Sequence, residues 1–222
     1  MKSSSVLAAG VAGAALLLLS PAASLAASPT TVSVRVEGLN NTLLPATRVR
    51  TQRGSITKGG APRGACPATN AAGALDAATH DDWTGSYDSF GLSVVSILGE
   101  SHPFSSSDYW SVFVNGHYAS AGICDLRLAR GEQLLFAAVP QRGTEHPLAI
   151  SAPRHAGHRF TVTVTAYRAR GAARPIAGAS VTDGGVTNRH GRTTVRVPRS
   201  GRVTLTASRR GHIRAETTVR VR

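Results

Sequence analysis

The sequence lacks the motifs by which most hydrolases and nucleotide-binding enzymes are identified. It has no HExxH zinc motif, and neither a Gly-x-Ser-x-Gly elbow nor an SxxK step stands in a suitable context. The glycine-rich stretch 59–64 (GGAPRG) lacks the Walker spacing, so no phosphate-binding loop is indicated. These absences disfavour an enzyme, and we expect a non-catalytic protein without a cofactor.

The N-terminus has the features of a secretory signal peptide. A positively charged start precedes an uncharged apolar run over 6–19, and the small residues 21–27 (PAASLAA) offer cleavage after Ala26 or Ala27. The run of 14 residues is shorter than the roughly 20 that a transmembrane helix needs. We therefore expect residues 1–27 to be removed. The mature chain is then secreted or extracytoplasmic, and either released or peripheral to the cell envelope without spanning the membrane.

Cysteine is scarce as well, and the two residues present are Cys66 and Cys124. Two lone thiols without a CxxC pair are poor candidates for a zinc site. An even count in an exported chain favours a disulfide, which would leave Cys124 unable to act as a nucleophile. Closing a loop of this length would stabilise the fold by about 4 kcal/mol on the chain-entropy account.

Charge divides the remaining sequence into two parts. Residues 28–150 carry nine lysines and arginines against ten acidic residues, whereas residues 151–222 carry fifteen arginines against Asp183 and Glu216. Between the parts, 141–158 is rich in proline, glycine and histidine, which indicates a semi-extended linker. We predict three segments after the signal: a first domain over 28–140, a linker over 141–158 and a second domain over 159–222.

The first domain is predicted to be α+β, mainly β with one helix. Residues 69–79 are the plausible helix, with Thr69 or Asn70 as its cap and Leu75 as its apolar anchor. Residues 40–64 are expected to form an irregular hairpin and loop, and the helix is expected to cover one sheet face. The first predicted strand places Val32, Val34 and Val36 on one face. The other predicted strands are 91–98, 109–114, 123–128 and 134–139.

The second domain is predicted to be an all-β sandwich. Short alternating stretches are separated by glycine-containing turns, and no helical pattern is present. The predicted strands are 160–167, 179–182, 192–197, 202–208 and 215–221.

Three blocks of the first domain keep a recognisable order and character. They are CPATNAAGALDAAT (66–79), DWTGSYDSFGLSVVSILGE (82–100) and YWSVFVNGHYASAGICDLRLARGEQLLF (109–136). With them, residues 31–139 resemble the domain of unknown function that also forms the C-terminal β-domain of transcobalamin and intrinsic factor. Glu132 departs from the aspartate that the family more often shows. The resemblance implies a fold and an extracellular context, while corrinoid binding in transcobalamin also depends on a helical barrel that this chain lacks.

The second domain carries the phrases RPIAGASVTDGGVTNRHGRTTVRV (174–197) and GRVTLTASRRGHIRAETTVRV (201–221). These resemble carboxypeptidase-regulatory-like or bacterial immunoglobulin-like modules. The resemblance implies a spacer, stalk or adhesive unit of an exported protein.

The stretch WSVFVNGHYASAGIC (110–124) is predicted to be a hairpin, because the Asn-Gly pair at 115–116 tolerates the positive φ of a tight turn. Trp110 and Phe113 should point to opposite sheet faces. Tyr118 either pairs across the hairpin as scaffold or, with Trp110 and His117, stacks on a small molecule such as a corrinoid or sugar.

A metal site is a further hypothesis, and it would make the protein a metal-dependent hydrolase. Asp76 and His80 are four residues apart and could share a helix face. His155 and His158 are three apart but lack a third ligand and a general base. Solvated turn carboxylates remain the competing interpretation, so we assign no metal ligand. The acidic cluster comprises Asp76, His80, Asp81, Asp82 and Asp88.

The arginines of the second domain are the clearest functional indication, because they would create a positive field that attracts polyanions. Nucleic acid is not expected as a partner of an exported protein, so anionic cell-envelope polymers or lipid headgroups are the better candidates. Arginine far outnumbers lysine throughout, so a compositional bias without a partner stays open. The candidate polyanion contacts are Arg192, Arg196, Arg199, Arg202, Arg209, Arg210 and Arg214, with Arg220 and Arg222 on the same strands.

Together these features predict an exported, non-catalytic binding or surface-interaction protein. The first alternative is an extracellular small-molecule carrier, and the second is the metal-dependent hydrolase.

Overall fold

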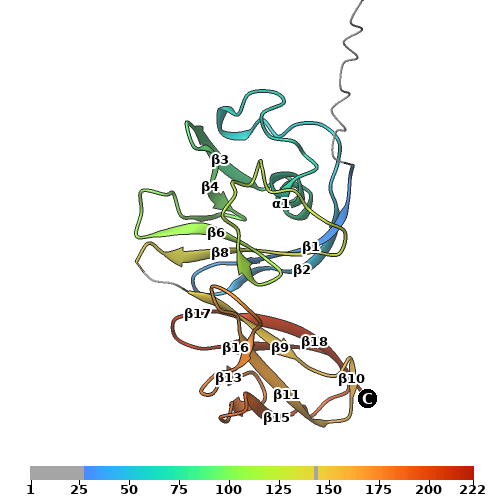
Figure 1. The fold of residues 1–222 in the computed structure, drawn as a ribbon. Coiled ribbons are helices and arrows are strands. Elements are labelled where there is room, and N and C mark those ends of the chain that lie inside the picture. Colours follow the sequence, from blue (N-terminus) through green and yellow to red (C-terminus); the bar gives the residue numbers. More distant parts are fainter. Residues whose placement is uncertain (1–27, 143–144) are drawn as a thin grey trace, which may run out of the picture.

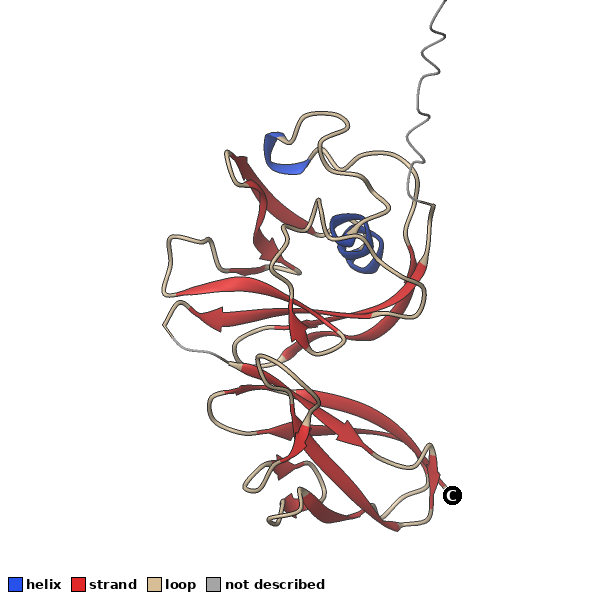
Figure 2. Cartoon of the chain, in the orientation of Figure 1, coloured by secondary structure: helices blue, strands red, loops and turns tan. Residues whose placement is uncertain are grey.

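The chain folds into two β-rich units that lie one above the other in Figure 1. The computed structural model describes residues 28–142 and 145–222, so the expected signal peptide (1–27) lies outside the described residues. The described chain is mostly strand with one α-helix (Figure 2), which confirms the predicted fold class. We call residues 28–142 the N-terminal module and residues 145–222 the C-terminal module. No helix in the described ranges is long and apolar enough to cross a bilayer.

The N-terminal module is built on a five-stranded sheet with the order β2-β1-β8-β6-β7. Strands β1 and β8 are parallel, while β2 and β6 flank them in antiparallel pairing. The irregular hairpin and loop expected over 40–64 contain one regular element, the strand β2, which pairs antiparallel with the buried strand β1 and satisfies its second edge. The strands are β1 (Thr31–Glu37), β2 (Thr42–Arg50), β6 (Asp108–Val114), β7 (His117–Tyr118) and β8 (Gln133–Pro140).

Helix α1 (Ala71–Thr79) packs on one face of this sheet. Leu75 is fully buried, as predicted, and belongs to the same core as Val34 and Phe136. Four alanines on the helix are buried with it, and their small side chains allow the helix to lie close to the strands. Beside the helix, a small sheet joins β3 (Trp83–Asp88), β4 (Gly91–Ile97) and β5 (Glu100–Ser101), with the 3-10 turn η1 (Lys58–Gly60) against β3.

Residues 123–125 form a turn and 126–128 are irregular, so the prediction of a strand over 123–128 is wrong. The segment passes the start of α1, and the helix uses its carbonyl groups. Ala71 N donates a hydrogen bond to Leu126 O (3.1 Å), and Ala72 N donates to Ile123 O (3.0 Å). Two of the amides that a helix leaves unpaired at its N-terminus are thus satisfied by main chain.

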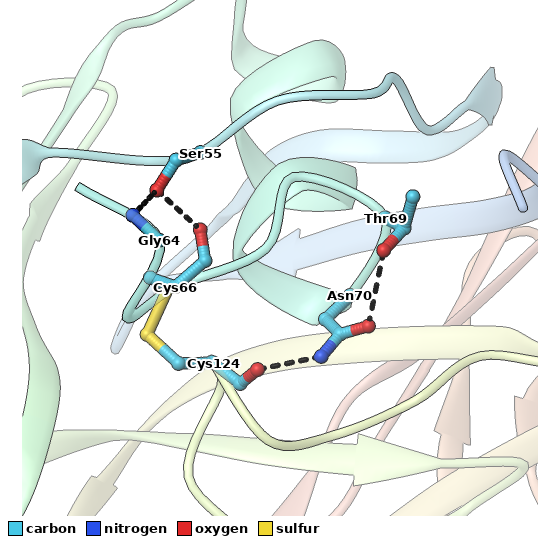
Figure 3. Close-up of a disulfide and its surroundings, with 6 residues drawn as sticks. All are labelled: Ser55, Gly64, Cys66, Thr69, Asn70 and Cys124. Carbon is cyan, nitrogen blue, oxygen red and sulfur yellow. Dashed lines mark hydrogen bonds between the residues drawn. A yellow bond between two sulfur atoms is a disulfide. The ribbon is translucent and has the colours of Figure 1, made fainter. Parts of the chain in front are cut away.

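The Cys66–Cys124 disulfide fastens this segment to the loop before α1, which confirms the predicted bridge (Figure 3). Asn70 is the cap residue, but its side chain makes no capping bond. Its amide nitrogen instead donates to Cys124 O at 2.6 Å. Ser55 Oγ accepts from Gly64 N (2.9 Å) and donates to Cys66 O (3.3 Å), so three loops meet at the disulfide.

Strand β8 is buried on both faces, whereas the sequence predicts only one covered face. Leu134 and Phe136 face α1, while Leu135 and Ala137 face the C-terminal module. Ile213 of the C-terminal module completes this second cluster. Because α1 and the C-terminal module cover the two faces of β8, its sequence is an almost continuous apolar run. A strand buried on both faces does not alternate between apolar and polar residues.

The C-terminal module is a sandwich of two sheets around a core that includes Val162, Val195 and Leu205. The first sheet comprises β10 (His155–Ala156), β18 (Ala215–Val221), β16 (Gly201–Ser208), β13 (Ser180–Val181) and β14 (Gly185–Val186). The second comprises β12 (Arg174–Pro175), β11 (Arg159–Ala166), β9 (His146–Ser151) and β17 (His212–Ile213), with β15 (Arg192–Arg196) on β11.

The predicted linker 141–158 is wrong over 146–151 and 155–156, because these residues form β9 and β10. Strand β9 pairs with β11, and β10 pairs with β18, so the two strands belong to different sheets of the sandwich. Of the two prolines in this stretch, Pro147 is the second residue of β9, and Pro153 lies between β9 and β10.

Candidate binding surface

A buried carboxylate joins the two modules. Glu37, at the end of β1, is 1% exposed. Its Oε1 accepts hydrogen bonds from Arg35 Nη1 (2.6 Å) and Thr42 Oγ1 (2.9 Å). Its Oε2 accepts a hydrogen bond from Arg214 Nε of the C-terminal module (3.1 Å), and the same oxygen forms an ion pair with Arg214 Nη2 at 2.9 Å. Both oxygens are therefore paired, as a buried charge requires.

Arg214 uses its remaining donors on the main chain of the N-terminal module. Its Nη2 donates to Gly38 O (2.8 Å), and its Nη1 donates to Leu39 O (3.0 Å). In return, Arg35 Nη2 donates to Arg214 O (2.9 Å). The prediction of Arg214 as a polyanion contact therefore needs correction, because its guanidinium is committed to the module junction.

Burial shapes the electrostatics of this junction. Desolvation lowers the pKa of the Arg35 guanidinium, and the nearby Glu37 charge opposes that effect. Burial also raises the pKa of Glu216, and the Glu37 charge raises it further. The junction thus holds two carboxylates. That of Glu37 is fully paired, whereas burial disfavours the charged form of Glu216.

An aromatic contact closes the other side of the junction. The ring of Tyr167 lies directly over Gly116 in the β6–β7 turn, where a Cβ atom would collide with it. His117 meets the same ring edge-on, with 5.4 Å between the centroids. Asn115 and Gly116 both have positive φ, which confirms the predicted tight turn.

The predicted ligand-binding residues do not form one site. They are Trp110, His117 and Tyr118. Trp110 is buried in the helix-side core, with its ring edge-on to His102. Tyr118 is 61% exposed and packs edge-on against Phe113 on the opposite sheet face, 5.9 Å between centroids. The predicted alternation of Trp110 and Phe113 and the cross-hairpin pairing of Tyr118 are confirmed.

The acidic cluster is distributed among structural contacts. Asp76 Oδ1 accepts a hydrogen bond from Trp83 Nε1 (2.9 Å), and burial raises the pKa of the Asp76 carboxyl. Lys58 Nζ pairs with Asp81 Oδ1 at 2.7 Å and lowers the pKa of that carboxyl. Asp88 accepts from Phe90 N in the β3–β4 turn (2.8 Å). His80 and Asp82 complete the predicted set in the turn after α1. His155 and His158 lie in and beyond β10, where His158 Nδ1 is 2.8 Å from Val197 O.

The other arginines of the predicted set occupy two settings. Arg209 and Arg210 line a cleft of about 420 Å³ beside the junction, together with His212 and Glu145, and burial raises the pKa of Glu145. The remaining members are exposed on β15, on β16 and in the loop between them, and are Arg192, Arg196, Arg199 and Arg202.

The exposed arginines follow from simple strand alternation. Arg196 stands between the buried Val195 and Val197, and Arg220 stands between the buried Val219 and Val221. Because successive strand residues point to opposite faces, burying the valines turns the guanidinium groups outward. The core of the sandwich and its positive surface are thus specified by the same residues.

Sequence reasoning missed the residues of the junction. Arg35 and Glu37 share a strand face in TVSVRVE, but two charges on one face are the usual pattern of a solvated strand. Tyr167 and Ile213 carry no motif of their own. The one available signal is the uninterrupted apolar run LLFAAV in β8, which indicates a strand covered on both faces.

Neither a protein-family model nor a curated protein sequence matches the chain. Solved structures with similarity include haptocorrin in complex with Cbi, at 20% identity and a TM-score of 0.39. That match covers 51% of this chain but only 25% of haptocorrin. Another is a candidate metal-binding protein from Ruminococcus gnavus, at 11% identity and a TM-score of 0.36, covering 50% of this chain and 97% of that one.

Both TM-scores lie below 0.5, so neither likeness carries a ligand or an activity over to this chain. The expected family relations of the two halves stay predictions.

Proposed function

We propose that this chain is an exported, non-catalytic binding protein whose C-terminal module attaches it to anionic polymers of the cell envelope. The observation that carries the proposal is the concentration of fifteen arginines against two acidic residues in 151–222. Exposed guanidinium groups on strand faces create a positive field that acts over about one Debye length, roughly 8 Å at physiological salt.

The contrast between the modules supports this assignment of roles. The N-terminal part is close to neutral, so a general bias toward basic residues would not by itself concentrate the charge in one module. Arginine also suits phosphate and carboxylate groups, because its planar fork makes two parallel hydrogen bonds. The disulfide suits an oxidising compartment, where envelope polymers are found.

The module junction supports a role in which one module anchors the other. Arg214 binds Glu37 and two carbonyl groups of the N-terminal module, and Ile213 completes an apolar cluster with β8. A polymer held by the C-terminal module would therefore hold the N-terminal module in a set orientation.

The two alternatives have less support. A small-molecule carrier would need its aromatic residues on one surface, but Trp110 and Tyr118 lie on opposite faces of the sheet. A hydrolase would need free carboxylates, but Asp76 and Asp81 are engaged by Trp83 and Lys58.

Co-sedimentation of the mature chain with envelopes of the producing cells tests the proposal. We expect the protein to sediment at about 0.02 M salt and to be released at about 0.5 M, because screening shortens the reach of exposed charges. Retention at the higher salt would indicate a specific contact of another kind. Failure to sediment at either salt would contradict the proposal.

A further inference from the structure

Two arginines face each other directly across neighbouring strands of the C-terminal module. In the antiparallel pair β16–β18, Arg202 is the register partner of Arg220. Register partners share a sheet face, and their Cβ atoms lie about 5 Å apart. Both side chains are exposed. Alternation turns both side chains outward, but it does not offset their repulsion, because like charges directly opposite each other destabilise a sheet.

The row continues onto a third strand. His155 of β10 is the register partner of Arg220 on its other side. Since neighbouring strands are about 4.8 Å apart, Arg202, Arg220 and His155 form a line of hydrogen-bond donors across the sheet. The next rung on the same face pairs Thr204 with Thr218, whose exposed hydroxyl groups adjoin the row.

No carboxylate of the described residues compensates this row. None of its three members forms an ion pair within the described ranges. Of the two acidic residues in 151–222, Glu216 lies near Glu37 and Arg35 at the junction. The other, Asp183, forms no ion pair among the described residues. The row lies at the end of the sandwich remote from the N-terminal module, where β18 ends (Figure 1).

We propose that Arg202, Arg220 and His155 form a phosphate subsite, at which a phosphate group of an anionic envelope polymer bridges the two guanidinium groups. This inference rests on the proposed function and names the chemistry that it recognises. One guanidinium fork already uses both oxygens of a carboxylate, whereas the oxygens of a phosphate point in several directions and can serve two forks. The arginine pair therefore fits phosphate better than a carboxylate polymer.

A soluble polymer fits this end better than a lipid surface. Proteins that lie on membranes bury apolar side chains at the headgroup boundary. The large exposed apolar residues of the described chain lie on other elements, and are Leu39, Phe90, Phe104, Tyr118 and Val186. The row itself is bordered by threonines rather than by apolar residues.

A double-mutant cycle on the mature chain tests the subsite. The variants are Arg202→Thr, Arg220→Thr and their combination, since the adjacent Thr204–Thr218 rung shows that threonine pairs fit here. Arg50→Thr is the matched control, because Arg50 is exposed on β2 of the N-terminal module and faces Thr31 rather than a second arginine. The probes are inorganic phosphate and long-chain polyphosphate, each compared with chloride at equal ionic strength.

In chloride, each single variant should raise Tm by about 1–3 °C because it relieves the repulsion, and Arg50→Thr should leave Tm nearly unchanged. In phosphate, the coupling between positions 202 and 220 should change sign and become favourable, because both guanidinium groups then bind one anion. The affinity for polyphosphate should fall about tenfold in Arg220→Thr and less than twofold in Arg50→Thr.

General screening can reduce the repulsion to zero but cannot make it attractive, so a coupling that only decays in phosphate overturns the subsite. Binding to phosphatidylglycerol vesicles without a sign change in phosphate overturns it as well. Envelope binding that survives in the Arg202→Thr/Arg220→Thr variant would leave the proposed function intact and reject the subsite. Sign reversal without envelope binding would retain the subsite and reject the proposed function.

Discussion

Glu37 is the residue on which the junction between the modules most depends. It is fully buried and charged, and its partners come from both modules: Arg35 and Thr42 from the first, and Arg214 from the second. A buried ion pair of this kind adds little stability compared with an apolar contact, but removing one partner leaves a charge without compensation. The network therefore favours one arrangement of the modules over others.

Replacing Arg214 with methionine should lower the free energy of unfolding by about 3–5 kcal/mol, because Glu37 stays buried with one cationic partner fewer. Arg210→Met is the matched control, since Arg210 is exposed and forms no ion pair among the described residues, and should change stability by less than about 0.5 kcal/mol. Urea unfolding followed by fluorescence measures both variants. Equal effects of the two substitutions would contradict the junction network.

The β6–β7 hairpin is the element that carries the aromatic half of the junction. Its turn needs positive φ at Asn115 and Gly116, and the Tyr167 ring covers the second of these. Gly116 therefore meets two requirements at once, a left-handed backbone and the absence of a side chain.

Gly116→Ala should destabilise the protein more than Gly131→Ala does. Both glycines have similar positive φ, +84° and +86°, but only the Gly116 position faces Tyr167. Backbone strain should cost each variant about 1–2 kcal/mol, and the collision should add about 1–3 kcal/mol for Gly116→Ala. Thermal unfolding of both variants separates the two causes, and equal losses would show that the ring contact is unimportant.

The disulfide is the second element-level constraint, because it holds segment 123–126 where its carbonyls meet the start of α1. Replacing both Cys66 and Cys124 with alanine should lower the free energy of unfolding by about 4 kcal/mol for a loop of this length. Amide hydrogen exchange should then quicken first at Ala71 and Ala72, whose acceptors are in that segment. Unchanged protection there would show that the segment is placed without the bridge.

At the level of elements, prediction succeeded where the pattern was local. The helix around Leu75, the Asn115–Gly116 turn and the alternating strands of the C-terminal module are set by their own residues. Prediction failed where distant partners decide. The pattern of residues 123–128 is that of a strand, but carbonyl groups of this segment accept hydrogen bonds from the N-terminus of α1. The composition of 146–151 is that of a linker, but this segment pairs with β11. The side-chain roles of Glu37 and Arg214 could not be predicted from the sequence. A charged residue in or beside a strand gives the same sequence pattern whether its side chain is solvated or paired with a buried partner.

At the scale of the whole molecule, the two modules differ in charge but are fastened together. The chain carries a net charge of +13, and residues 151–222 carry most of its arginine. Within the C-terminal module, the arginines other than Arg214 are exposed on strands and loops. This division supports an account in which the C-terminal module binds an anionic surface and thereby holds the N-terminal module beside that surface.

The most direct test of that account compares two full-length variants with equal loss of charge. One replaces four exposed arginines of the C-terminal module with threonine, and the other replaces four exposed arginines of the N-terminal module. The first set is Arg159, Arg196, Arg202 and Arg220, and the second is Arg48, Arg50, Arg53 and Arg63. Binding to isolated envelopes is measured at increasing salt. We expect the first variant to lose at least about tenfold in affinity, with a weaker salt dependence, while the second binds like the wild type. Equal losses in both would mean that net charge alone governs binding and would contradict the assignment to the C-terminal module.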